Sequence, residues 1–263
     1  MSLRIAFDCD GVVADLESAL TELVTRLFGE SPPPEAPASG QGAAPPPTAS
    51  APTEAAPEPA APASDAATPS PASEAPAQDG PTEEEIQAAP ARFRTLSRRQ
   101  QHDLWEAVRN TENFWESLQE TEPGIIARLF RLARDRRWEV IFITQRPASA
   151  GDTTQLQTQR WLSAHGFDLP SVYVIKGTRG KVAEALSLDI VVDDRPENCL
   201  DVKLESRARA ILVWNGNLAD LPPNARRLGI EPVTSVGDCL GLLADVPAAK
   251  PGFFTRIKQL MGA

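Results

Sequence analysis

Short apolar runs and helical apolar stripes alternate along most of this chain. Residues 3–7 form an apolar run typical of a strand buried on both faces. Gly11 then separates this run from residues 16–28, where apolar residues recur at helical spacing. Strand and helix patterns that alternate in this way favour a parallel sheet with helices on both faces. The predicted strands span residues 3–7, 139–143, 172–175, 189–192 and 210–214, with a weaker one near 232–233, and the predicted helices span residues 16–28, 96–110, 124–136, 154–165, 181–186 and 236–243.

One long segment breaks this pattern and predicts a disordered arm. Residues 31–91 carry 16 of the 25 prolines, and no Lys or Arg occurs from residue 28 to residue 91. The segment has almost no large apolar residues, so it cannot bury enough surface to offset its chain entropy. Its prolines favour extended polyproline II conformations. Ten acidic residues, Glu30 included, account for the whole formal net charge of −10, because 26 acidic and 26 basic residues remain elsewhere.

The pattern therefore predicts one doubly wound α/β core with interruptions. We expect residues 1–30 to begin the core, residues 31–91 to be the acidic Pro/Ala-rich insertion, residues 92–120 to form a small helical cap, and residues 121–246 to complete the core. The cap falls between the first helix and the second strand, where it can cover the ligand edge of the sheet. Residues 247–263 form an amphipathic tail that packs on the domain or contacts anionic lipid or a partner.

Two carboxylates end the first predicted strand. Asp8 and Asp10 belong to the run FDCDGVVAD, and residues two apart in an extended strand project to the same side. Ligands of open α/β sheets bind at the carboxyl ends of the strands. Two ionised carboxylates at this spacing repel each other unless a cation or a shared proton relieves them. Taken alone, the pair is equally compatible with an ordinary turn that contains Gly11.

Three further predicted strands run into polar residues. These are Thr144, Gln145 and Arg146 after the second strand, Lys176 and then Lys181 after the third, and Asp193 with Asp194 after the fourth. If the strands are parallel neighbours, four carboxylates, a hydroxyl and a lysine meet at one edge of the sheet. A hard cation with oxygen ligands would relieve that charge, which favours Mg²⁺. A hydroxyl and an ammonium group beside the metal suit the oxygens of a phosphoryl group.

These residues resemble the four motifs of the haloacid dehalogenase (HAD) superfamily of phosphohydrolases. The run Asp8-Cys9-Asp10-Gly11-Val12 resembles the first motif, Thr144 the second, Lys181 the third and the Asp193-Asp194 pair the fourth, in order along the chain. Within the superfamily the chain is most similar to the 5′(3′)-deoxyribonucleotidase family, through its DxDGVxAD opening, the FWExL element at residues 114–118, the spacing from Lys181 to Asp193 and the run DDRPEN. The pair Gln145-Arg146 departs from that family, as does the insertion before the cap, and both leave the substrate open.

The resemblance implies a Rossmann-like HAD core and a two-step mechanism. Asp8 is the nucleophile that becomes an aspartyl phosphate, and Asp10 is the acid that protonates the leaving oxygen and then the base that activates water. It implies that Mg²⁺ is held by Asp8, Asp10 (through its backbone carbonyl), Asp193 and Asp194, with Asp194 the preferred direct ligand of the pair. Thr144, Gln145 and Lys181 are the expected phosphate-binding residues.

Each candidate also has a plainer interpretation. Thr144 could be a strand-end cap, the Asp193-Asp194 pair could be solvated turn residues, and Lys181 could lie on a helix surface while Lys176 binds phosphate. Arg146 could clamp a substrate phosphate or be a solvated loop residue. Phe114 and Trp115 fit a cap core better than a base-stacking platform, and Cys9 fits packing better than nucleophilic chemistry.

Cysteine content and hydropathy indicate the cellular compartment. The three cysteines, Cys9, Cys199 and Cys239, are an odd number without metal-ligand spacing, which suits a reducing compartment. No apolar run approaches the roughly 18 residues that span a bilayer, and the first residues lead directly into a strand rather than an apolar leader. We therefore expect a cytoplasmic protein.

The sequence thus predicts a Mg²⁺-dependent phosphomonoester hydrolase, with a nucleoside monophosphate as the leading substrate by resemblance. An alternative is a weakly active or inactive core that acts as an interaction protein, with the proline-rich arm binding protein partners through residues 32–34 and 45–47. A nucleic-acid phosphatase is less consistent with the sequence, because no basic patch stands out beyond scattered arginines.

Overall fold

A computed structural model describes residues 2–29 and 81–245 of the chain. Most of the predicted arm and the whole of the predicted tail at residues 247–263 lie outside this range. None of the helices within it is both long and apolar enough to cross a membrane. The cysteines Cys9, Cys199 and Cys239 are buried and free of disulfides.

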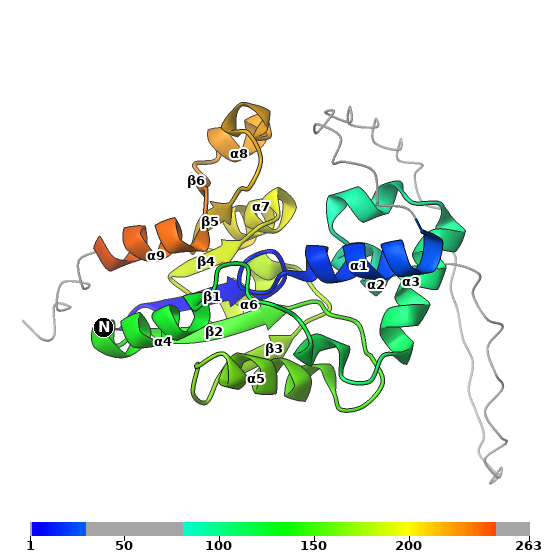
Figure 1. Cartoon of the computed structure of the whole chain (residues 1–263). Helices are drawn as coiled ribbons and strands as arrows, with labels where there is room; N and C mark the ends of the chain where they lie inside the picture. Colours follow the sequence, from blue (N-terminus) through cyan, green and yellow to red (C-terminus); the bar gives the residue numbers. More distant parts are fainter. Residues whose placement is uncertain (1, 30–80, 246–263) are drawn as a thin grey trace, which may run out of the picture. The chain divides into compact units, whose positions relative to one another are not determined.

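The core is a six-stranded parallel sheet in the order β3-β2-β1-β4-β5-β6 (Figure 1). The order reverses beside β1, which pairs with β2 on one side and with β4 on the other. This confirms the predicted doubly wound α/β fold class, in which ligands bind where the strand order reverses. The strands are β1 (Arg4–Asp8), β2 (Glu139–Thr144), β3 (Ser171–Val174), β4 (Ile190–Asp193), β5 (Arg209–Val213) and β6 (Glu231–Val233).

Both faces of the sheet are covered, which explains why its strands read as continuous apolar runs. Along β1, the side chains of Ile5 and Phe7 belong to one buried cluster and that of Ala6 to a second. Because side chains alternate along a strand, these clusters lie on opposite faces of the sheet. The first contains residues of α1, α4, α5 and α9, and the second contains residues of α6, α7 and α8.

Local sequence explains most of the helix boundaries. Asp15 caps α1 by accepting a hydrogen bond from the Ser18 amide, and Gly29 ends it in the left-handed conformation. Ser97 and Gln100 form a reciprocal capping box at the start of α3. The helices are α1 (Leu16–Phe28), α2 (Glu83–Ala88), α3 (Arg98–Asn110), α4 (Ile125–Arg136), α5 (Thr154–Ala164), α6 (Arg179–Ala185), α7 (Pro196–Glu205), α8 (Pro223–Arg227) and α9 (Val236–Asp245), with 3₁₀ turns η1 (Ala91–Thr95), η2 (Phe114–Glu116) and η3 (Leu218–Asp220).

Two differences from the predicted elements matter for function. Helix α7 was not predicted, because Pro196 opens it and few of its apolar residues recur at helical spacing. Helix α2 lies inside the range assigned to the disordered arm, so that boundary was placed too late. The capping box of Thr82 and Glu85 starts α2, and the buried Glu85 carboxylate pairs with Arg109 of α3. Local polar contacts order this piece despite its weak apolar pattern.

The segment that contains α2, η1 and α3 packs beside the first helix of the core. Helices α1 and α3 are in contact, and Arg92 of η1 pairs with Glu17 of α1 at 2.8 Å. Residues 92–120, the predicted cap, end in η2, whose Phe114 and Trp115 are buried in the core. Neither aromatic ring is therefore exposed to stack on a ligand.

Candidate functional site

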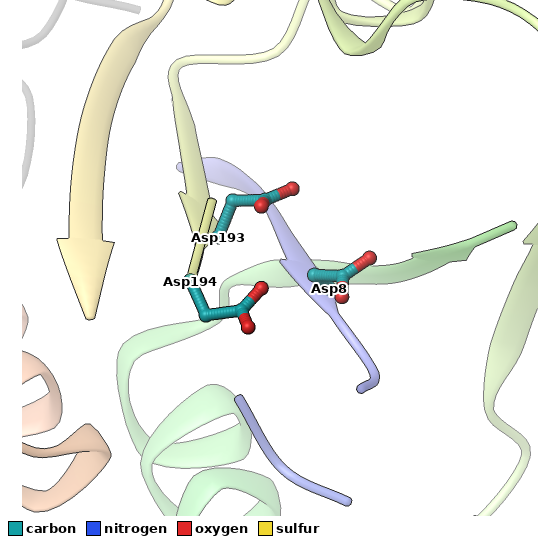
Figure 2. A group of neighbouring side chains, drawn as sticks. All are labelled: Asp8, Asp193 and Asp194. Atoms are coloured by element: carbon teal, nitrogen blue, oxygen red, sulfur yellow. The ribbon is translucent and has the colours of Figure 1, made fainter. Parts of the chain in front are cut away.

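Three carboxylates converge where β1 and β4 end (Figure 2). Asp8 is the last residue of β1, Asp193 is the last residue of β4, and Asp194 follows it. One carboxylate oxygen from each lies within 4.8 Å of the other two. Asp8 and Asp193 are buried. Pairing of β1 with β4 brings residues far apart in sequence together, as the strand-end pattern predicts.

Asp193 is held by hydrogen bonds from its surroundings. Its Oδ1 accepts from the Arg195 amide and from Asn198 Nδ2, both at 2.9 Å. Its Oδ2 accepts from Arg179 Nε at 3.1 Å and from the same Asn198 amide group at 3.0 Å. Both oxygens therefore have donors from the protein, so Asp193 chiefly orients the groups around it.

Asp194 differs from its neighbour because its Oδ1 atom is buried and has no hydrogen-bond partner among the described residues. Burial first, and then the charges of Asp193 and Asp8, raise the pKa of Asp194 well above its usual value. Gly11 makes room for this side chain, since a Cβ at residue 11 would overlap Asp194 Oδ2. An unpartnered buried carboxylate oxygen is costly unless something binds to it.

Asp8 also lies in a strongly desolvated position. Burial raises its pKa to about 8, and Arg179 opposes this shift while Asp193 and Asp10 add to it. The Nη2 group of Arg179 donates to Asp8 Oδ1. Asp8 is thus a buried carboxylate that forms an ion pair with one guanidinium group and lies close to other carboxylates.

Arg179 is the site residue that the sequence reasoning missed. It is the first residue of α6, it is buried, and it bridges Asp8 and Asp193. Burial alone would lower the pKa of its guanidinium, but the two carboxylates raise it above its usual value. Lys181, the predicted cation, is exposed two residues further along α6 and does not line the cavity beside the carboxylates. Lys176 is exposed as well.

Asp10 lies beside this cluster and has a different set of hydrogen-bond donors. Thr144 Oγ1 donates to Asp10 Oδ2 at 3.2 Å, and Arg146 donates to both oxygens of the same carboxylate. Thr144 ends β2 and is fully buried. Gln145 lines the cavity, and its Nε2 donates to the Gly177 carbonyl at 3.1 Å. The structure therefore brings together all the predicted site residues except Lys181.

A cavity of about 510 Å³ opens beside these residues. Asp8, Asp10, Gln145, Arg179 and Asp194 are among its lining residues. Further lining residues include 88–92 and Arg94 near η1, 195–198 at the start of α7, and 213–217 at the end of β5 and beyond it. The site is thus open to a ligand larger than a phosphate ion.

The donor set suits a divalent cation. Three of the four carboxylates, those of Asp8, Asp10 and Asp193, form ion pairs with the guanidinium groups of Arg146 and Arg179. Asp194 contributes the fourth carboxylate, and its buried Oδ1 has no hydrogen-bond partner among the described residues. Carboxylate oxygens in a polar cavity are ligands that Mg²⁺ prefers. The residues present therefore fit the metal that the sequence predicts, with Asp8 and Asp194 offering the oxygens.

No family model and no curated protein matches this chain. Among solved structures it is similar to a protein provisionally identified as a beta-phosphoglucomutase from Thermotoga maritima, with 15% identity, a TM-score of 0.47 and coverage of 93% of this chain and 100% of that one. A hydrolase from Pseudomonas syringae gives 10% identity and a TM-score of 0.47, covering 94% and 100% of the two chains. A haloacid dehalogenase-like family hydrolase from Streptococcus pneumoniae gives 11% identity and a TM-score of 0.43, covering 92% and 98%. The interpretation of the site rests on its own geometry.

Proposed function

We propose that this protein is a Mg²⁺-dependent phosphomonoester hydrolase of the HAD type, with Asp8 as its nucleophile. The observation that carries the proposal is the position of Asp8 at the end of β1, where Arg179 orients it and the unpartnered oxygen of Asp194 lies nearby. Asp10, two residues on, faces the same cavity. A nucleophile, an acid and a cation site at one strand-order reversal form the set that phosphoryl transfer through an aspartyl phosphate needs.

In the proposed mechanism Asp8 and Asp10 have different roles. Asp8 attacks phosphorus while Asp10 gives a proton to the departing oxygen, so the alcohol leaves and an aspartyl phosphate remains on Asp8. Asp10 then takes a proton from water as the water oxygen attacks the same phosphorus, which releases phosphate and restores the Asp8 carboxylate and the protonated Asp10. Arg179 holds Asp8 during both steps, and Gln145 and Thr144 border the space for the phosphoryl oxygens.

The metal would be held by Asp8 and Asp194, with Asp193 orienting Arg179 and the start of α7. When bound, Mg²⁺ supplies positive charge that stabilises the phosphoryl oxygens and offsets the repulsion among the carboxylates. Asp8 carries a pKa raised to about 8 without such a cation. A cation beside it favours the ionised, nucleophilic form at neutral pH.

The leading substrate is a nucleoside monophosphate, as the resemblance of the sequence to deoxyribonucleotidases implies. The same cavity is also lined by Trp214, Asn215 and Arg94. An aromatic face can stack on a base, and amide and guanidinium groups can donate to the polar edges of a base or a sugar. These residues support a substrate that extends beyond its phosphate.

Phosphate release tests the proposal. We expect wild-type protein with Mg²⁺ to hydrolyse a panel of 5′- and 3′-nucleoside monophosphates and sugar phosphates, and we expect EDTA to abolish turnover. Asp8→Asn should lower kcat by about 10³-fold or more, because it removes the nucleophile while keeping the shape of the side chain. Glu139→Gln, at the exposed amino end of β2 and outside the cavity, is the control and should keep activity. Turnover that survives Asp8→Asn or EDTA would refute the mechanism.

A further inference from the structure

Arg146 is buried to a degree unusual for an arginine, and among the residues that the structure describes it pairs with one carboxylate, that of Asp10. Its side chain is 0% exposed. Its Nε donates to both oxygens of Asp10 at 3.0 Å, and its Nη2 donates to Asp10 Oδ1 at 2.8 Å. This bidentate geometry fixes the plane of a carboxylate as well as its position.

A slot of aromatic and hydroxyl groups fixes the guanidinium itself. Its carbon lies 4.9 Å from the centre of the Trp115 ring and 5.7 Å from that of Trp161. The remaining group, Nη1, donates to Thr158 Oγ1 at 3.0 Å, and Thr158 donates in turn to the Thr154 carbonyl at 2.7 Å. All three nitrogens of the guanidinium therefore have acceptors, and its faces have aromatic neighbours.

The walls of the slot are themselves anchored. Trp115 Nε1 donates to the Pro147 carbonyl at 3.0 Å, and Trp161 Nε1 donates to the Leu118 carbonyl at 2.7 Å. Trp115 and Trp161 are both buried. Residues from η2 and α5, distant in sequence from Asp10, thus hold Arg146 in one place.

Only the Asp10 end of this network reaches the cavity. Asp10 lines the cavity and its side chain is 17% exposed, whereas Arg146 and Thr158 are buried behind it. A buried arginine costs desolvation energy that a hydrophobic side chain would avoid. The contacts of Arg146 therefore fix the orientation of one carboxylate that lines the cavity.

We propose that Arg146 is a positioning residue, which holds the Asp10 carboxyl in the orientation needed to transfer a proton to the leaving oxygen. The inference rests on the proposed function. In the first step the proton moves from Asp10 to the leaving oxygen as the bond between that oxygen and phosphorus breaks. Arg146 touches neither the substrate nor the transferred proton and acts only through Asp10.

Leaving-group dependence distinguishes this role from simple support of the fold. An alkyl phosphate needs a proton on its poor leaving group, whereas p-nitrophenyl phosphate departs as a stable phenolate without one. Because general-acid catalysis contributes about 10²- to 10⁴-fold, we expect Arg146→Gln to lower kcat/KM for the alkyl phosphate at least ~10-fold more than for p-nitrophenyl phosphate. Asp10→Asn should show the same selectivity, and Arg146→Lys, which keeps the charge, should recover part of the loss.

Two further variants complete the test. Arg160→Gln, on the exposed side of α5 where Arg160 pairs with Asp152 and Glu116, is the matched control and should leave the ratio between the two substrates unchanged. If Arg146→Gln does not fold, Thr158→Val removes the acceptor of Nη1 and should change the ratio in the same direction by less. Equal losses for both substrates in the folded variant would overturn the inference. Wild-type protein that hydrolyses neither substrate would instead contradict the proposed function.

Discussion

The two ends of the central sheet handle charge in opposite ways. At the amino ends of the strands, Arg4 pairs with Glu139 at 2.9 Å, with side chains 37% and 56% exposed. Arg209 pairs with Glu231 at 2.6 Å, again with both side chains well exposed. Ion pairs of this kind contribute little to stability, about 0–1 kcal/mol each, because water already solvates both partners.

At the carboxyl ends of the strands, charged side chains are buried. Asp8 is 6% exposed and Asp193 is 0% exposed, and Arg179 between them is 3% exposed. Buried carboxylates that crowd one another cost free energy, which folding alone gives no reason to retain. In this comparison the charges at the amino ends are solvated, whereas those of Asp8, Asp193 and Arg179 at the carboxyl ends are desolvated.

The largest expected contrast lies between two cations of α6. Arg179→Gln should reduce kcat by about 10³-fold, since it removes the charge that holds the buried Asp8 and leaves that carboxylate unpaired. Lys181→Gln should change kcat by less than about 3-fold, because Lys181 is exposed and does not line the cavity. Steady-state phosphate release measures both variants. A severe loss in the lysine variant and a mild one in the arginine variant would restore the sequence-based assignment.

A smaller effect is expected in the dependence of stability on pH. Burial raises the pKa of Asp8 from 3.8 to about 8, so between these values the folded state binds more protons than the unfolded state. In EDTA the free energy of unfolding should therefore be greatest at the low-pH end of this window and should fall as the pH rises through about 8. The upper limit of this fall is about 1.4 kcal/mol for each unit by which the pKa of Asp8 is raised. Thermal unfolding from pH 5 to pH 8.5 measures this.

Two comparisons sharpen the pH experiment. Asp8→Asn should flatten the profile, whereas Glu139→Gln at the exposed end of the sheet should leave its slope unchanged. Saturating Mg²⁺ should also flatten it, because the metal favours the ionised carboxylates. A profile that rises with pH in EDTA would contradict the assignment of Asp8 as a desolvated acid.

The smallest expected effect concerns the space that Gly11 leaves for Asp194. Gly11→Ala combines a positive φ of +78° with an overlap between the new Cβ and the Asp194 carboxylate, whereas Gly29→Ala adds a Cβ at φ +70° with no heavy atom within 4 Å. Backbone strain is common to both and costs of order 1 kcal/mol. We expect Gly11→Ala to lower the free energy of unfolding by about 1–2 kcal/mol more than Gly29→Ala and to weaken Mg²⁺ binding. Equal losses of unfolding free energy in the two variants would show that the Asp194 side chain has room to move.

The sequence predicts the fold, and it predicts which strand-end residues lie close together, for a simple physical reason. Strands buried on both faces produce clear apolar runs, and the residue that follows each run lies at the same edge of a parallel sheet. Asp8, Asp10, Thr144 and Asp194 are therefore recognisable from their places at strand ends. The structure brings them together through the pairing of β1 with β2 and β4.

The basic part of the site depends on features that a sequence pattern does not reveal. Thr178 caps α6, so the helix begins at Arg179, two residues before the predicted start at Lys181, and Arg179 pairs with the buried carboxylates while Lys181 is exposed. Gly180 lets the helix pack against α7, where a Cβ would collide with the Asp201 carbonyl oxygen. Helix starts are uncertain by a residue or two from sequence, and such a shift exchanges one side chain for another. Arg146 depends on Trp115, 31 positions earlier in the sequence, and no local pattern links the two residues.

The most direct test of the account is to look for the phosphoryl group on Asp8. Asp10→Asn protein should be mixed with p-nitrophenyl phosphate and Mg²⁺, quenched in acid, and examined by intact-mass and peptide-mapping mass spectrometry. Because this variant lacks the base that activates water, the account predicts a burst of one p-nitrophenol per chain and one phosphoryl group on the peptide that contains Asp8. Steady turnover by the wild type, with no burst and no phosphorylated peptide in either protein, would contradict a covalent mechanism at Asp8.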